Sequence, residues 1–153
     1  MKVLDWDRLK PGGIKNTALT IGAFDGVHLG HREIFRQLIA LSREKGLVPV
    51  AITFQPLPRE VFAKKQGAIA ILSFEERKRR IELCGIERLV VIKFSRAYAK
   101  VSARDFMEQA RANIVMFGWR NRIKGLKSWS ILRKFLRSKF RQSLLPSGIN
   151  APG

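Results

Sequence analysis

The sequence predicts an α/β three-layer sandwich built on a parallel sheet, and two observations support this prediction. Apolar segments of strand length alternate along the chain with segments in which apolar residues recur at helical spacing. The strand-length segments are rich in valine, leucine and isoleucine, as strands covered on both faces should be. Because a strand–helix–strand unit of this length implies parallel strands with a right-handed crossover, we expect ligands at the carboxyl ends of the strands.

The first expected unit lies in residues 17–54. Residues 17–21 are expected to form a short buried strand. Residues 29–45 carry apolar side chains at helical spacing, and Gly46 supplies a stop for this helix. Residues 47–54 form the second expected strand, which the following prolines break.

The second half of the domain repeats this alternation. Ser73 is expected to cap a helix that runs to about Cys84, with Glu76 as its capping-box partner. The basic run at residues 77–80 lies on this helix beside glutamates, and we interpret it as a solvated face rather than a nucleic-acid patch. The remaining expected elements are a strand at residues 88–94, a helix from Ser102 to about Ala112 and a fourth strand at residues 114–117.

Length and composition predict a soluble, cytoplasmic protein. A chain of 153 residues fits one domain, or one domain with an appendage. The single cysteine allows no internal disulfide, which suits a reducing compartment. The first ten residues contain two aspartates and no apolar run, so we expect no signal peptide, and no apolar window is long enough to span a membrane.

The net charge of +18 is unevenly distributed along the chain. Residues 1–110 hold 20 basic and 12 acidic side chains, whereas residues 111–153 hold 10 basic side chains and no acidic ones. The body is therefore moderately basic, as a binder of phosphorylated ligands can be. We place a domain at residues 1–117 and a basic tail at residues 118–153.

The most informative motif is His28-Leu29-Gly30-His31, at the point where the first strand runs through glycines into a helix. Residues three positions apart share one helical face, so both imidazoles can reach one anion together. The free N–H groups and the positive dipole end of the helix point to the same place. Gly22 lets the backbone turn tightly, and Gly30 lets a phosphate approach the main chain. This pattern favours a nucleotide phosphate site.

Two other interpretations of the histidine pair stay open at this point. A His-x-x-His pair occurs in metal sites, but a metal needs three or four ligands, and this chain has two histidines and one cysteine. We therefore expect no dedicated metal site. The pair is also compatible with a structural role in capping the helix.

Four segments resemble a known family. The phrase Ile21–His31 is similar to the signature of bacterial FAD synthetase, whose full-length form is a bifunctional riboflavin kinase/FMN adenylyltransferase. The segments 53–62, 72–77 and 94–106 resemble that family's later segments in character and order, so the resemblance covers roughly residues 10–115. It implies a Rossmann-like nucleotidyltransferase fold of the His-x-Gly-His type, incomplete at the C-terminus.

The resemblance implies adenylyl transfer, in which ATP and FMN give FAD and diphosphate and Mg²⁺ accompanies ATP. It implies catalytic roles for His28 and His31. The residues that it places around the ligands are Gly22, Phe24, Asp25 and Gly30 for the nucleotide, and Thr53, Pro56 and Arg59 for the flavin. Alternatives remain for three of them: Asp25 as a helix cap, Pro56 as a strand end and Arg59 as an exposed arginine on a short helix.

The chain also departs from the family pattern. The family often has asparagine where Ala23 stands and histidine where Leu57 stands, and either change would weaken ligand contacts. After Ile114 the family's Gly-x-Asp/Asn-Phe-x-Phe-Gly segment is replaced by Gly118–Gly125, and nothing resembles its Ser-Ser-Thr-x-Ile-Arg segment. We therefore expect an FMN adenylyltransferase domain or an inactive, truncated relic of one, without the riboflavin kinase domain. Another His-x-Gly-His nucleotidyltransferase, of the cytidylyl- or pantetheine-phosphate adenylyltransferase type, is the alternative, as is a non-catalytic basic binding module.

Three interpretations compete for the tail. It fits a degenerate or out-of-frame end, because it lacks carboxylates altogether. It also fits a basic amphipathic helix for acidic surfaces, since Leu132, Phe135 and Phe140 fall on one face among basic residues. Nucleic-acid binding with Trp119 and Trp129 as stacking platforms has no recognised motif to support it, so we expect no specific nucleic-acid partner.

Overall fold

The computed structural model describes residues 1–10, 13–14, 16–63, 70–110 and 114–116. Its strands are β1 (Lys2–Asp5), β2 (Thr17–Ile21), β3 (Val48–Phe54), β4 (Arg88–Ile92) and β5 (Ile114–Met116). Its α-helices are α1 (Leu29–Lys45), α2 (Pro58–Phe62), α3 (Phe74–Leu83) and α4 (Ala103–Ala110). Short 3₁₀ helices cover Trp6–Arg8 and Tyr98–Lys100. The predicted tail at 118–153 lies outside the described residues, as do the predicted element ends at Ala112 and Phe117.

The five strands form one parallel sheet in the order β1-β4-β3-β2-β5. The predicted parallel α/β architecture is confirmed. The sequence did not predict β1, because only two of its four residues are apolar and the strand lies at the sheet edge. Its ladder with β4 pairs Lys2 with Arg88 and Asp5 with Val91.

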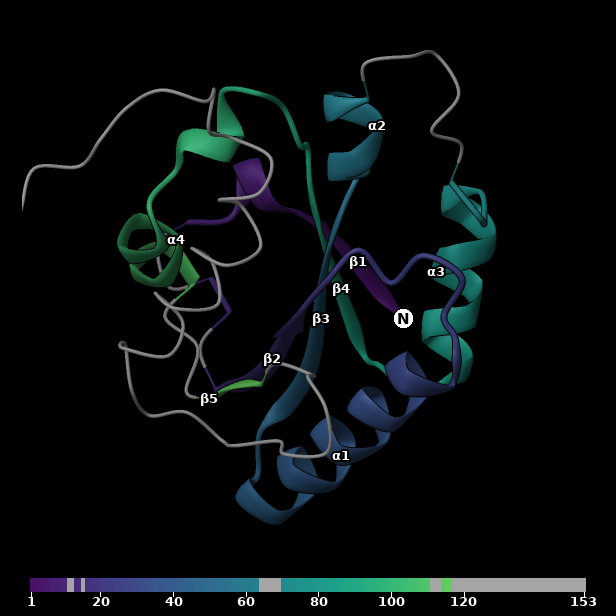
Figure 1. The fold of residues 1–153 in the computed structure, drawn as a ribbon. Coiled ribbons are helices and arrows are strands. Elements are labelled where there is room, and N and C mark those ends of the chain that lie inside the picture. The colour runs from purple at the N-terminus through teal and green to yellow at the C-terminus, as the bar shows by residue number, and fades with distance from the viewer. Residues whose placement is uncertain (11–12, 15, 64–69, 111–113, 117–153) are drawn as a thin grey trace, which may run out of the picture.

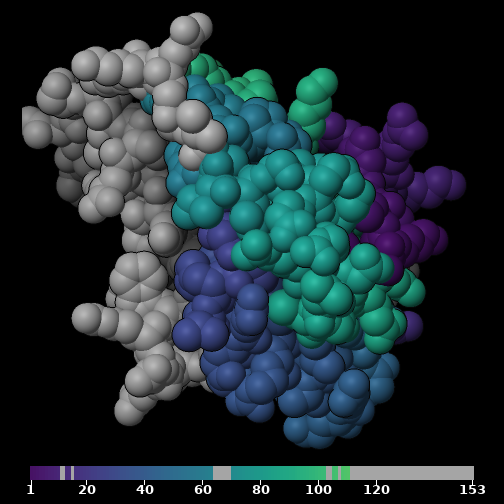
Figure 2. Space-filling view, turned by 90° about the vertical axis from the view of Figure 1, so that its right-hand side faces the viewer, coloured from purple at the N-terminus to yellow at the C-terminus, as the bar shows by residue number. Residues whose placement is uncertain are grey.

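Helices cover the sheet on both faces, which gives the three layers (Figure 1). On one face, Phe35 and Leu38 of α1 and Ile81 of α3 pack on Ala18 and Ala51 of the sheet. Figure 2 looks onto this face, where the teal α3 and the blue α1 lie side by side. On the other face, α4 contributes Phe106 and Ala110 to a second core; its strand residues include Leu19, Val50, Ile52, Val90 and Ile92. Burial of each large apolar side chain contributes about 1.5–3 kcal/mol.

The helix ends follow local rules that the sequence displays. Gly46 ends α1 in the left-handed region at φ 61°, where glycine carries no steric penalty. The Ser73 hydroxyl accepts a hydrogen bond from the Glu76 N–H at 3.2 Å, as expected for a cap. The Glu76 carboxylate forms ion pairs with Arg79 and Arg80.

This topology brings the ends of β2, β3 and β4 to one edge of the sheet. The loop after β2, the segment after β3 and the turn after β4 therefore lie near one another, although up to about 70 residues separate them in sequence. Within the described part of the chain, no helix is long and apolar enough to cross a membrane.

Candidate active site

The two histidines of the predicted motif lie together at the start of α1. His28 is the N-cap residue and is exposed, and His31 is half-buried in the first turn. Their rings stack with centroids 3.7 Å apart and an interplanar angle of 23°. His28 makes no side-chain capping bond, so the structural-cap interpretation does not fit its side chain. Among the described residues, no group of three histidine, cysteine, aspartate or glutamate side chains is arranged to hold a metal ion.

His31 is held in its neutral form by its surroundings. Burial, followed by the nearby His28, lowers the pKa of His31 to about 4, although the Asp25 carboxylate acts in the opposite direction. Its Nδ1 atom is buried and has no hydrogen-bond partner among the described residues. The first N–H groups of α1 have no partner within the helix ladder. The pair and the helix end together offer several donors to one anion.

The loop after β2 has a fixed and unusual backbone. Phe24 and Val27 adopt positive φ values of 48° and 42°, which cost roughly 1–3 kcal/mol per residue outside glycine. Both residues are buried, and the Phe24 ring packs on Phe35 at 4.8 Å and against the edge of His31 at 5.3 Å. Packing in the core therefore offsets the backbone strain and holds His31 in place.

The two glycines predicted to face the nucleotide have neighbours within the protein. A Cβ atom on Gly22 would lie 2.9 Å from the Phe24 ring, closer than real contacts allow. A Cβ atom on Gly30 would lie 3.2 Å from the His28 ring. In this structure the two glycines therefore make room for the Phe24 and His28 side chains of the histidine loop (residues 22–28). Their contact with a phosphate stays a prediction.

Asp25 connects three parts of the site. One carboxylate oxygen accepts hydrogen bonds from the main-chain N–H groups of Ile71 and Leu72, at 2.9 and 3.3 Å. The other oxygen forms an ion pair with Arg59. The N-cap of α1 is His28, so the alternative role of Asp25 as a helix cap is wrong. Instead, Asp25 joins the predicted nucleotide loop to the predicted flavin side.

The residues predicted to contact flavin lie at the end of β3 and in α2. Thr53 is fully buried, and its hydroxyl donates to the Ala23 carbonyl at 3.1 Å. Pro56 is exposed in the segment after β3. Arg59 lies in the first turn of α2, with its side chain 44% exposed. The structure thus brings Arg59 beside the histidine loop and places Thr53 beneath it.

Arg77 corrects the interpretation of the basic run as a solvated face. Its side chain is 1% exposed and donates to the carbonyl oxygens of Ala23 and Phe54 and to Gln55 Oε1. The other three residues of the run are paired with glutamates on the surface of α3, as predicted. The signal for Arg77 was present in the helical period, because it lies three residues after Phe74 and four before Ile81.

Sequence reasoning also missed an aromatic cluster at the same edge of the sheet. Phe94 contacts Phe54 at 5.4 Å, Phe62 at 5.8 Å and Tyr98 at 6.1 Å between ring centroids. The Tyr98 hydroxyl is buried without a hydrogen-bond partner among the described residues, and burial raises the pKa of this hydroxyl. Aromatic residues recur where β3 and β4 end, and this recurrence was the available signal.

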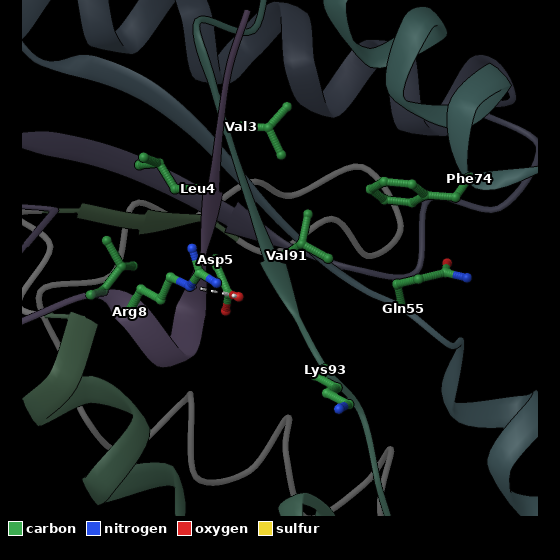
Figure 3. Close-up of a pocket in the computed structure, with 9 residues that line it drawn as sticks. Val3, Leu4, Asp5, Arg8, Gln55, Phe74, Val91 and Lys93 are labelled. Atoms are coloured by element: carbon green, nitrogen blue, oxygen red, sulfur yellow. Dashed lines mark ion pairs between the residues drawn. The ribbon is translucent and has the colours of Figure 1, made fainter.

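An open hollow of about 590 Å³ lies along β1 and β4 (Figure 3). Val3 and Val91 form its apolar wall, and Phe74 and Gln55 stand on the opposite side. Neither histidine of the motif lines it. The hollow therefore borders the candidate site through Gln55, which accepts a hydrogen bond from Arg77.

The sheet and the position of the His-x-Gly-His turn define the class, an α/β domain with a nucleotidyltransferase-like fold. The chain belongs to the FAD synthetase family, whose model matches residues 11–119. It is 33% identical over 92 residues to the bifunctional riboflavin kinase/FMN adenylyltransferase of Buchnera aphidicola, covering 60% of this chain and 29% of that protein. The proteins of the same description from Escherichia coli and Bacillus subtilis are 34% and 35% identical over 89 and 94 residues, covering 58% and 61% of this chain.

The chain spans only 28% to 30% of the length of these three relatives. Among solved structures, the chain is similar to the crystal structure of a macrolide-efflux protein from Streptococcus pneumoniae. That match has a TM-score of 0.63 and 25% sequence identity, and it covers 77% of this chain and 50% of the other. The likeness supports the fold described above.

Proposed function

We propose that residues 1–117 form an adenylyltransferase domain that converts ATP and FMN to FAD and diphosphate. The observation that carries the proposal is the stacked pair of His28 and His31 at the N-terminus of α1, beside free main-chain donors. Membership in the FAD synthetase family supports FMN as the acceptor over cytidylyl or pantetheine-phosphate chemistry. The proposal treats the basic tail at 118–153 as a part of the chain separate from this domain and gives it no role in the reaction.

In the proposed step, a phosphate oxygen of FMN attacks the α-phosphorus of ATP, and the bond to the leaving diphosphate breaks. Such a displacement needs positioning and neutralisation of charge more than covalent help. His28 and His31 would donate to oxygens of the transferring group, whose charge is most concentrated in the transition state. Loss of one preorganised donor of this kind typically costs about 10²–10³ in rate.

The remaining residues divide between the two ligands. Gly22, Phe24, Asp25 and Gly30 would shape the nucleotide side, with Phe24 acting from below through its packing on His31. Arg59 would grip the flavin phosphate with paired hydrogen bonds once it leaves Asp25, while Thr53 and Pro56 shape the loop beneath. The aromatic cluster around Phe94 offers flat apolar surfaces suited to an isoalloxazine ring.

The residues of the described site do not fit a protein-bound Mg²⁺. Both carboxylate oxygens of Asp25 already have partners, and no acidic cluster among the described residues could enclose the ion. We therefore expect Mg²⁺ to enter with the phosphates of ATP, whose oxygens suit a hard cation.

The test is FAD formation by the purified chain with ATP, MgCl₂ and FMN, followed by reversed-phase chromatography. We expect His28→Ala and His31→Ala each to lower the rate about 10²–10³-fold. Lys45→Ala, at the far end of α1, is the matched control and should leave the rate unchanged. Absence of FAD, together with no thermal stabilisation by FMN, FAD or ATP, would overturn the proposal. Stabilisation by ATP alone would favour a different acceptor.

A further inference from the structure

Arg77 is a buried cation with unusual partners. None of the described carboxylates forms an ion pair with it. Its guanidinium instead donates to the Ala23 carbonyl at 3.3 Å, the Phe54 carbonyl at 2.9 Å and Gln55 Oε1 at 2.7 Å. Asp25 and Glu60 attract this cation from farther away, and Arg59 repels it. A buried charge without a carboxylate in direct contact is expensive to keep in a protein interior. If this inner position of α3 served only to pack the helix on the sheet, a hydrophobic residue would do so without the free-energy cost of burying a charge.

The three acceptors belong to the two sides of the candidate site. Ala23 lies in the histidine loop, directly before the strained Phe24. Phe54 directly precedes the flavin segment, defined as residues 55–59, and Gln55 is its first residue. The planar guanidinium presents donors in a fixed fork, so one side chain holds both main-chain segments at a set spacing.

Other contacts reinforce the same junction. The Thr53 hydroxyl donates to the same Ala23 carbonyl that accepts from Arg77. Asp25 accepts from the N–H groups of Ile71 and Leu72, which immediately precede α3. The start of α3 is therefore tied to the histidine loop at two points, through Asp25 and through Arg77. Asp25 reaches the flavin segment through its ion pair with the Arg59 side chain, whereas Arg77 holds the Phe54 main chain and the Gln55 side chain directly.

We propose that Arg77 is a positioning residue that sets the spacing between the histidine loop and the flavin segment, and so aligns the two phosphates that react. This inference rests on the proposed function for its catalytic consequence. The structural part of the inference, that Arg77 fixes the position of the histidine loop, does not depend on the proposed function. Arg77 does not touch the reacting atoms and acts through the main chain of Ala23 and Phe54.

The experiment compares Arg77→Lys and Arg77→Met with Arg79→Lys and Arg79→Met. Arg79 lies on the same helix, is exposed and pairs with Glu76, so it is a matched control. A lysine retains the charge but presents one ammonium, which does not reproduce the fork between the two segments. We expect both Arg77 variants to lose about 10- to 100-fold in kcat, with KM for ATP changed less, because misalignment affects the reacting geometry. The Arg79 variants should keep the parent kcat.

A second measurement does not depend on activity. The chain has only two histidines, so a proton NMR titration follows each ring separately. We expect the titration midpoint of His31 to rise toward its ordinary value of 6.5 in the Arg77 variants, because a released loop exposes this ring. His28 and Asp25 also face His31, and both are unchanged in these variants. The Arg79 variants should titrate like the parent chain.

The outcomes separate the two proposals. Parent-like kcat and a parent-like His31 midpoint in Arg77→Lys would overturn the positioning role. If the parent chain makes no FAD and is not stabilised by FMN, FAD or ATP, the proposed function fails, and the His31 titration alone decides the role of Arg77. Should the Arg77 variants not fold, Gln55→Ala is the substitute, because it removes one of the three acceptors of Arg77 and Gln55 is exposed. An unchanged kcat together with an unchanged His31 midpoint in this variant would overturn the inference.

Discussion

His31 links the chemistry of the candidate site to the stability of the domain. Burial and the neighbouring His28 lower the pKa of His31 from 6.5 to about 4 in the folded chain. Below about pH 6.5 the unfolded chain therefore binds a proton at this residue that the folded chain does not bind. We expect the free energy of unfolding to decrease as the pH falls from 6.5 toward 4, and urea denaturation at half-unit intervals measures this decrease.

The control for this prediction is His31→Gln, which removes the titration and keeps a polar side chain. The slope between pH 6.5 and 4.5 should be smaller in this variant than in the parent chain. Glu33 and Glu76 also have lowered pKa values, each of about 2, but their effect appears only below about pH 4.5. If the free energy of unfolding depends equally on pH in the parent and the variant, folding does not lower the pKa of His31.

Residue-scale chemistry explains which parts of the candidate site the sequence reveals. Both histidines are visible because their spacing and the preceding glycines are local features. The Asp25–Arg59 ion pair joins residues 34 positions apart, and no local pattern contains it. The interpretation of residues 77–80 as a solvated face rested on their charge and placed Arg77 at the surface. The position of Arg77 in the helical repeat instead matches the inner face of α3.

At the scale of elements, periodicity and caps predict most of the fold. β2, β3 and β4 are apolar runs buried on both faces. A glycine stop at Gly46 marks the end of α1, and a serine cap at Ser73 marks the start of α3. β1 was missed because its stability comes from pairing with β4 and not from its own composition. The strand order could not be predicted from local sequence patterns either, because it depends on contacts between distant segments.

The cap at Ser73 provides a prediction at the same scale. Its hydroxyl satisfies the Glu76 N–H at the start of α3, the helix that carries Arg77. Ser73→Ala should lower the free energy of unfolding by about 1 kcal/mol, as loss of a serine cap typically does. Ser73→Asp is the control, because aspartate caps equally well and its charge suits the helix N-terminus. Chemical denaturation of both variants measures the difference, and equal losses in the two would argue against the cap.

At the scale of the whole molecule, the charge divides the chain into two regions. More than half of the net charge of +18 lies in residues 111–153, which contain no acidic side chain. In the body, by contrast, many cations are paired on the surface, as Arg36 is with Glu33 and Arg79 with Glu76. A segment that carries basic side chains and no acidic ones attracts a polyanionic surface more strongly than a segment in which both signs are mixed, and salt screens the attraction.

The concentration of basic residues in the tail predicts that the full chain binds an anionic surface through the tail. We expect the chain to bind vesicles of phosphatidylserine and phosphatidylcholine in low salt, and to be released as NaCl is raised. Each basic side chain near such a membrane contributes about 1 kcal/mol. Replacing Arg133, Arg137 and Arg141 together with glutamine should therefore weaken binding about 100-fold in a sedimentation assay.

The matched control removes the same charge from the body, by replacing Lys10, Arg43 and Lys93 with glutamine. These three side chains are exposed in the described part of the chain, and none of them belongs to the tail. Their loss should weaken vesicle binding much less than loss of the three tail arginines. Equal weakening in the two triple variants would mean that net charge alone attracts the chain. Charge concentrated in the tail would then have no separate role in binding, and the tail would not be the anion-binding part of the molecule.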